Sequence, residues 1–225
     1  MKLIRPQLVT VLLASALSIL SCSELTQADE NVVPSILRVV LEPDPTDSTI
    51  TILGETFGVS DGDSLGINVY QGRAISADSN FALLYKNVNS WRQDQHTYNL
   101  LLRENGNFIE HTVFESFVPP GEYSAISLGL EGFHMQVGPY SIPVELSKAL
   151  DPIAEFPAEY SMEEGKVTEI HILIEPFNSM TRQLDSYVFS RQAKVGDIIY
   201  LPESEFDELV QDLPYLINPN DPYGG

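Results

Sequence analysis

The chain has 225 residues, and its 12 basic and 32 acidic side chains give it a net charge of −20. A hydrophobic content of 43% is enough for a folded core and excludes a disordered acidic chain. The negative charge and the lack of a Lys/Arg cluster exclude nucleic acid as a partner and electrostatic docking on anionic lipid.

The N-terminus has the pattern of a signal peptide over residues 1–21. Lys2 and Arg5 precede an apolar run from Leu8 to Leu20. As a helix this run would measure roughly 20 Å, which is short for a bilayer-spanning segment. Its removal would take Lys2 and Arg5 with it and bring the mature net charge to about −22.

The lone cysteine, Cys22, follows directly. Ile19-Leu20-Ser21-Cys22 resembles the bacterial lipobox, although Leu20 is bulkier than the small residue usual there. The resemblance implies cleavage before Cys22, a diacylglyceryl group on its thiol and an acylated amino terminus. Ser23 in place of aspartate implies, by the same resemblance, the outer rather than the inner membrane. The alternative is a secreted protein whose cysteine lies near the cleavage site by chance.

The mature chain reads as a tether, a β-sandwich and a short tail. Residues 22–34 are polar and end in Pro34, which is typical of a tether. Short runs rich in Val, Ile, Tyr and Phe then predict an all-β domain over residues 35–200, followed by a short helix and loose tail over 201–225. The expected strands are Ile36–Leu41, Thr49–Leu53, Leu65–Tyr70, Phe81–Tyr85, Tyr98–Arg103, Phe108–Phe117, Tyr123–Leu130, Tyr140–Leu146, Ala154–Tyr160, Val167–Ile174 and Ser186–Phe189, and the expected helix is Glu203–Leu213.

Two local patterns support this prediction. In Val167–Ile174, Ile170 and Ile172 alternate with Glu169 and His171, so one face is expected in the core and the other in water. Asn105-Gly106 lies between two predicted strands and favours the positive φ angles of a tight hairpin turn.

Several stretches after Tyr98 resemble a group of secreted bacterial lipoproteins described by a domain of unknown function, DUF4382. The resemblance rests on the order of Tyr98–Gly106, Pro120–Leu128, Tyr140–Val144 and Phe156–Ile174, followed by Ser179 and Tyr187. It implies a transthyretin-like β-sandwich, so the expected fold is an antiparallel sandwich of the transthyretin or immunoglobulin-like type. Ile52–Gly58 is similar instead to a turn of immunoglobulin-like IPT/TIG modules, which leaves residues 36–96 open as a separate module. Neither resemblance implies a catalytic residue.

The sequence assigns no metal ligand, cofactor site or catalytic residue. The histidines are far from one another and lack the spacing of a zinc site. An EF-hand fails because Thr49 stands where the loop needs glycine, and Asp61 and Asp63 are expected in a solvated turn rather than a cation site. No serine lies in a nucleophile elbow, and Trp91 is expected to cap the core rather than to bind sugar or a partner. The four histidines are His96, His111, His134 and His171.

Three hypotheses about function follow. The first is a non-enzymatic lipoprotein, anchored to the membrane through Cys22, whose sandwich serves envelope structure, adhesion or partner binding. The second is a carbohydrate-active or carbohydrate-binding protein with a site in the sandwich loops. The third is an accessory module of a larger surface complex.

Overall fold

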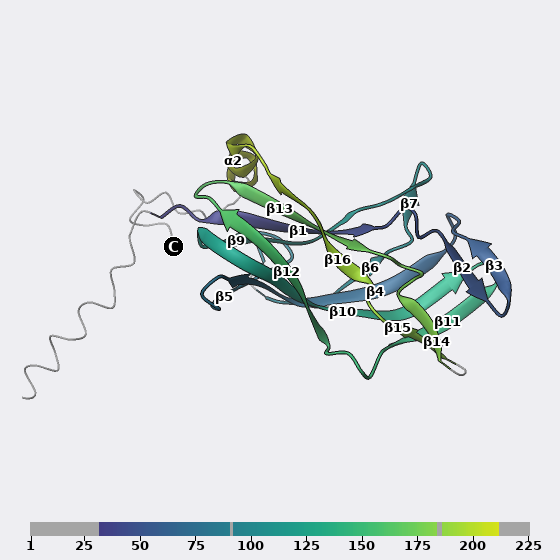
Figure 1. Cartoon of the computed structure of the whole chain (residues 1–225). Helices are drawn as coiled ribbons and strands as arrows, with labels where there is room; N and C mark the ends of the chain where they lie inside the picture. Colours follow the sequence, from purple (N-terminus) through teal and green to yellow (C-terminus); the bar gives the residue numbers. More distant parts are fainter. Residues whose placement is uncertain (1–31, 91, 184–185, 212–225) are drawn as a thin grey trace, which may run out of the picture. The chain divides into compact units, whose positions relative to one another are not determined.

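A computed structural model describes residues 32–90, 92–183 and 186–211 (Figure 1). The chain divides into two units, Met1–Val32 and Val33–Gly225, and the strands lie in the second. That unit is an all-β sandwich with a short C-terminal helix, as the sequence predicts. Across the described ranges, no helix has the length and apolar character needed to cross a membrane.

One layer of the sandwich is a four-stranded sheet. Its first strand is central, because it pairs in parallel with a strand late in the chain and antiparallel with one from the middle. The order across the sheet is β16 (Ala193–Tyr200), β13 (Val167–Ile174), β1 (Ser35–Pro43) and β9 (His111–Val118).

The other layer is built around two long antiparallel strands, β4 (Ser64–Ser76) and β10 (Gly121–Val137). Each is long enough to pair with two shorter strands along its other edge. These are β6 (His96–Asn99) and β5 (Phe81–Leu83) on β4, and β12 (Ile153–Met162) and β11 (Tyr140–Leu146) on β10. The layer continues from β11 to β15 (Ser186–Phe189) and β14 (Met180–Gln183).

Two small hairpins and one helix complete the unit. The hairpins are β2 (Thr49–Ile52) with β3 (Glu55–Gly58), and β7 (Arg103–Glu104) with β8 (Asn107–Phe108). The helix is α2 (Glu203–Gln211), whose acidic first turn suits the positive end of the helix dipole.

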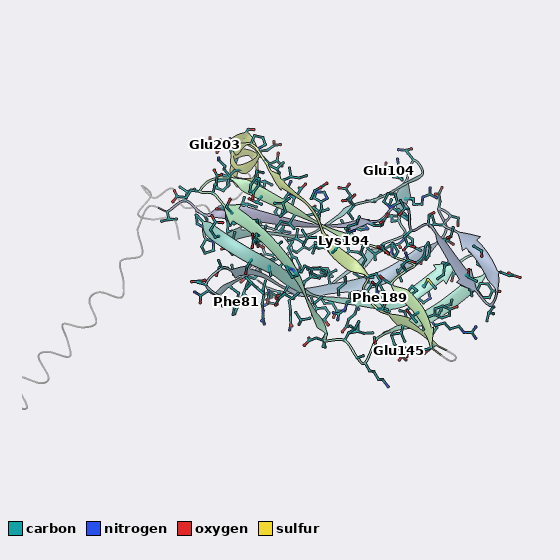
Figure 2. All side chains as sticks on the ribbon, viewed as in Figure 1. Phe81, Glu104, Glu145, Phe189, Lys194 and Glu203 are labelled. Carbon is teal, nitrogen blue, oxygen red and sulfur yellow. The ribbon has the colours of Figure 1, made fainter. Side chains whose placement is uncertain are left out.

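The core lies between the two layers. Alternate residues of β1 and β13 point to one side of their sheet, and those of β4 and β10 point back toward them. Phe189 of β15 is also fully buried, whereas the labelled Phe81 is exposed (Figure 2). The inward side chains of these four strands are Leu37, Val39, Leu41, Ile170, Ile172, Ile174, Leu65, Ile67, Val69, Ile126, Leu128 and Leu130.

A close contact joins the layers at Gly72 of β4 and Phe114 of β9. A Cβ atom added to Gly72 would lie 2.6–2.8 Å from three atoms of the Phe114 ring. Real Cβ atoms essentially never approach other atoms so closely, and Phe114 is buried. The ring therefore occupies the space that any side chain at position 72 would need.

The outer face of the four-stranded sheet is also partly covered. Ile36 of β1 and Val167 of β13 point away from the main core, yet both are fully buried because Phe206 of α2 packs over them. The helix thus forms a second, smaller apolar cluster at one end of this face, and the rest of the face carries the charged groups described below.

The structure corrects the extent of the hairpin at Asn105-Gly106. The turn is present, with φ angles of 52° and 85°, but β7 and β8 contribute only two residues each. The flanking strands do not pair with each other, because β6 joins β4 in one layer and β9 joins β1 in the other. Leu100 lies between β6 and β7 and is fully buried, so the chain crosses between layers there.

Candidate functional site

Arg38 of β1 lies at the centre of a charged cluster on the outer face of the four-stranded sheet. The strand register places Glu115 of β9 on one side of it and Glu169 of β13 on the other. Arg38 Nε donates to Glu115 Oε2 at 2.9 Å, Nη1 to Glu169 Oε2 at 3.1 Å, and Nη2 to Glu205 Oε1 of α2 at 3.2 Å. The planar guanidinium therefore ties three strands and the helix together.

His171 of β13 extends this cluster along the sheet. Its Nε2 is 2.9 Å from Glu169 Oε1, and its Nδ1 is 3.1 Å from Glu42 Oε2 of β1. Only 7% of the residue is exposed. The sequence expectation that His171 lies on a wet face is therefore wrong: the side chain does point away from the core, but carboxylates from β1 and β13 surround it.

Hydrogen bonds within the cluster shift the pKa values of His171 and Glu169 in opposite directions. Burial by itself would lower the pKa of the His171 imidazole, but its hydrogen bonds to Glu169 and Glu42 raise that pKa above its ordinary value. Burial would likewise raise the pKa of the Glu169 carboxyl, and its bonds with His171 and Arg38 instead bring that pKa below its ordinary value. The contacts with Arg38 and His171 thus favour the ionised form of Glu169.

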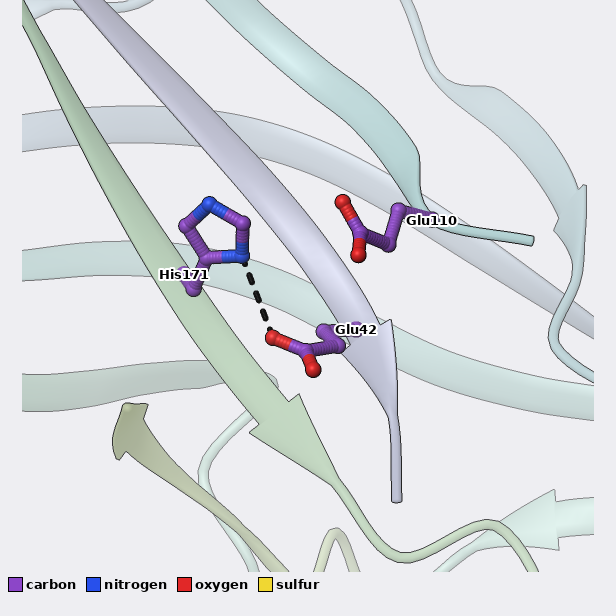
Figure 3. A group of neighbouring side chains, drawn as sticks. All are labelled: Glu42, Glu110 and His171. Atoms are coloured by element: carbon purple, nitrogen blue, oxygen red, sulfur yellow. Dashed lines mark hydrogen bonds and ion pairs between the residues drawn. The ribbon is translucent and has the colours of Figure 1, made fainter. Parts of the chain in front are cut away.

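A third carboxylate faces His171 from the segment that precedes β9. Glu110 is exposed, and Figure 3 shows its carboxylate and that of Glu42 beside the imidazole. One ligand atom from each of Glu42, Glu110 and His171 lies within 4.8 Å of the other two. Among the described residues, no other group of three His, Cys, Asp or Glu side chains meets this spacing.

Phe81 of β5 marks a second surface feature. It is 57% exposed and lies between two shallow clefts. The larger, of about 470 Å³, is lined by residues that include Asp78, Asn80 and Glu122. On the other side the guanidinium carbon of Arg73 lies 4.9 Å from the centre of the Phe81 ring. The feature combines an exposed aromatic ring with several groups that accept or donate hydrogen bonds.

Contacts within the loops occupy the carboxylates of Asp61 and Asp63. Asp63 is 6% exposed, and its two carboxylate oxygens accept from the backbone N–H groups of Ser60, at 2.7 Å, and Gly138, at 2.9 Å. Asp61 is exposed, with its carboxylate 3.9 Å from Arg103 Nη1. The expectation of a solvated turn is therefore wrong for Asp63, because burial pairs its oxygens with backbone donors.

His111 of β9 packs against an aromatic ring. Its ring is half-buried against Tyr98, with the ring centres 5.3 Å apart, and its Nε2 lies 3.0 Å from the backbone oxygen of Asn99. Burial lowers the pKa of His111, and the bond to Asn99 opposes that shift only in part. Two further sequence candidates, Cys22 and Trp91, lie outside the described residues.

No pattern in the sequence indicates the group formed by Glu42, Glu110 and His171. Glu42 and His171 are 129 positions apart, and they meet only because β1 pairs with β13 in parallel. Alternation in β13 does identify the face that His171 shares with Glu169, but not the neighbouring strand. The cluster can be found only when the parallel pairing of β1 with β13 is known.

Comparison with known proteins identified no relative of this chain. No protein-family model matches the chain, and the searches of curated proteins and of solved structures found no match either. The resemblances drawn from individual motifs therefore stay predictions.

Proposed function

We propose that this protein is a membrane-anchored, extracytoplasmic lipoprotein whose β-sandwich serves envelope structure, adhesion or partner binding and is not an enzyme. The observation that carries the proposal is the N-terminal pattern, in which Lys2 and Arg5 precede an apolar run that ends at Cys22. A cysteine at that place is the acceptor expected for lipid, and more than one acyl chain gives a stable anchor.

The position of the first strand agrees with this arrangement. β1 begins at Ser35, so roughly a dozen residues separate the folded sandwich from Cys22, and such a segment spans at most about 45 Å when fully extended. That length would let the domain reach beyond the lipid headgroups while remaining tied to the membrane.

The use of the acidic side chains favours binding over catalysis. Asp47 and Asp63 are buried and accept hydrogen bonds from backbone N–H groups, while Glu115 and Glu169 hold Arg38. These carboxylates stabilise loops and strand contacts. The strong negative charge, by contrast, gives the surface an electrostatic preference for a basic partner or one bridged by cations.

Lipidation is tested by the intact mass of the protein isolated from membranes. We expect a mature chain that begins at Cys22 and carries acyl groups, and we expect Cys22→Ser to give an unprocessed or lipid-free protein. Ser21→Ala is the matched control, because it keeps a small residue beside the cleavage site. An acyl-free chain that begins at another residue would refute the anchor.

A carbohydrate-binding function is the alternative, and the surroundings of Phe81 favour it. An exposed ring can stack on the apolar face of a sugar, while Asp78, Asn80 and Glu122 in the adjoining cleft can bond to hydroxyl groups. NMR titration with oligosaccharides tests this alternative. The carbohydrate alternative requires that an oligosaccharide binds and that Phe81→Ala abolishes this binding. Phe133→Ala, which removes another exposed ring, should leave the binding intact.

Catalysis is tested separately with a panel of peptidoglycan, glycan and ester substrates. Hydrolysis that disappears when a single Asp or Glu is replaced, in a variant that stays folded, would overturn the non-enzymatic proposal.

A further inference from the structure

We infer that Glu42, Glu110 and His171 form a binding site for a divalent transition-metal ion of the Zn²⁺ class on the outer face of the four-stranded sheet. The site goes beyond the proposed function, because neither lipid anchoring nor partner binding requires it. Imidazole nitrogen with two carboxylates is a donor set that suits zinc and its neighbours in the first transition row.

The orientation of His171 is the first support. Its Nε2 lies 2.9 Å from Glu169 Oε1, and that carboxylate is itself held by Arg38. Its Nδ1 is directed to the other side, toward Glu42 (Figure 3). A histidine that binds a metal through one nitrogen commonly donates its other N–H to a carboxylate, which fixes the ring and strengthens it as a ligand. Glu169 is placed for that role.

The second support for the site is that two carboxylates face each other across neighbouring strands. β1 and β9 pair Leu41 with His111, so the next residue on each side brings Glu42 opposite Glu110. Like charges opposite each other on neighbouring strands are unfavourable. Glu110 makes no hydrogen bond or ion pair with the described residues, which leaves its carboxylate available to a cation bound beside His171.

The spacing is close to what one ion needs. The three ligand atoms lie within 4.8 Å of one another, whereas tetrahedral ligands about 2.0–2.2 Å from a zinc ion are separated by roughly 3.3–3.6 Å. The difference is within reach of the Glu110 side chain, because it is exposed and unattached. His171 and Glu42 come from paired strands of one sheet and need little movement.

Three protein ligands leave a coordination position for water or for a group from a partner. Glu110 is the exposed member of the cluster, so water or a partner group would reach the ion from its side. Ca²⁺ should bind less well than Zn²⁺, because calcium prefers six to eight oxygen ligands and gains little from imidazole.

The test is titration of the full-length protein, purified in detergent and treated with a chelator, with ZnCl₂ in a calorimeter. We expect one Zn²⁺ per chain, and we expect Glu110→Gln to weaken binding tenfold or more. Glu104→Gln is the matched control, because Glu104 is also an exposed glutamate of the same region but lies outside the cluster. X-ray absorption at the zinc edge should show a single imidazole with nitrogen and oxygen ligands at about 2.0–2.2 Å.

Two further variants separate binding from folding. His171→Gln should abolish binding, and Glu169→Gln should weaken it about 10–100-fold through loss of the contact to Nε2. If either variant is unfolded before metal is added, Glu110→Gln still decides the question, because Glu110 is exposed and acts on His171 only through its charge. Equal Zn²⁺ affinity in Glu110→Gln and Glu104→Gln, a spectrum without imidazole, or displacement of Zn²⁺ by equimolar Ca²⁺ would overturn the inference.

Discussion

The contact between Gly72 and Phe114 gives a direct test of how the two layers pack. In Gly72→Ala the new methyl group would lie 2.6–2.8 Å from three atoms of the Phe114 ring, roughly 1 Å closer than ordinary contact. Both strands are fixed by their sheets, so the ring must leave its rotamer or the layers must separate. Overpacking of this kind costs about 1–3 kcal/mol, or about 2–12 °C in melting temperature for a domain of this size.

The assay is urea or thermal unfolding of the purified protein with a second substitution to relieve the clash. Phe114→Leu alone should lower the free energy of unfolding through lost packing. In the Gly72→Ala background the same substitution should lower it less, because the smaller side chain makes room for the methyl group. Gly62→Ala is the control, because nothing lies within 4 Å of its Cβ position and its φ angle is ordinary. It should be neutral or slightly stabilising. Additive effects of the two substitutions would refute the packing argument.

Three other predictions concern polar contacts. Arg38→Ala should lower the free energy of unfolding by about 2–3 kcal/mol, because it leaves three carboxylates without their cation, and Arg38→Lys should restore less than half in the same urea titration. Asp47→Ala should cost about 2–4 kcal/mol by calorimetry, because two backbone N–H groups lose their acceptor, and Asp47→Asn should cost less. Hydrogen bonds from Ser76 and Asn80 hold the pKa of Asp78 below its ordinary 3.8, so the stability they contribute is complete above that pH and is lost as the pH falls through the lower folded value. In an NMR titration Ser76→Ala should raise this pKa, and an unchanged value would contradict the assignment.

The strands that the sequence predicts well are those whose apolar residues set them apart. Tyr140–Leu146, Val167–Ile174 and Ser186–Phe189 have the predicted bounds. Alternation marks the first two, and Ser186–Phe189 is a short apolar run that is buried from Tyr187 to Phe189. No expected strand covers β3, β14 or β16, and the expected strands reach only one residue each of the two-residue strands β7 and β8. β3, β14 and β16 lie at edges or in a small hairpin and keep much of both faces exposed, so they lack the apolar alternation that identifies a strand.

The cluster around His171 is less accessible to sequence reasoning for a different reason. The sequence identifies the face of β13 on which His171 lies, but the neighbours of that face come from distant strands. Parallel pairing with β1 brings in Glu42, and antiparallel pairing of β1 with β9 brings in Glu110. Local propensity contains no information about either pairing, because the choice depends on the packing of the complete sandwich.

The central place of β1 has a consequence for the order of events as the chain is made. Arg38 meets Glu115 across 77 positions and Glu169 across 131, so the first strand waits for partners that are synthesised much later. At about 5–20 residues per second, the second partner emerges on the order of 10 s after β1. During that interval β1 lacks its parallel neighbour, and the dominance of such distant pairings favours slow folding. The four-stranded sheet therefore cannot be completed until the last third of the chain has been made, because β13 and β16 lie there.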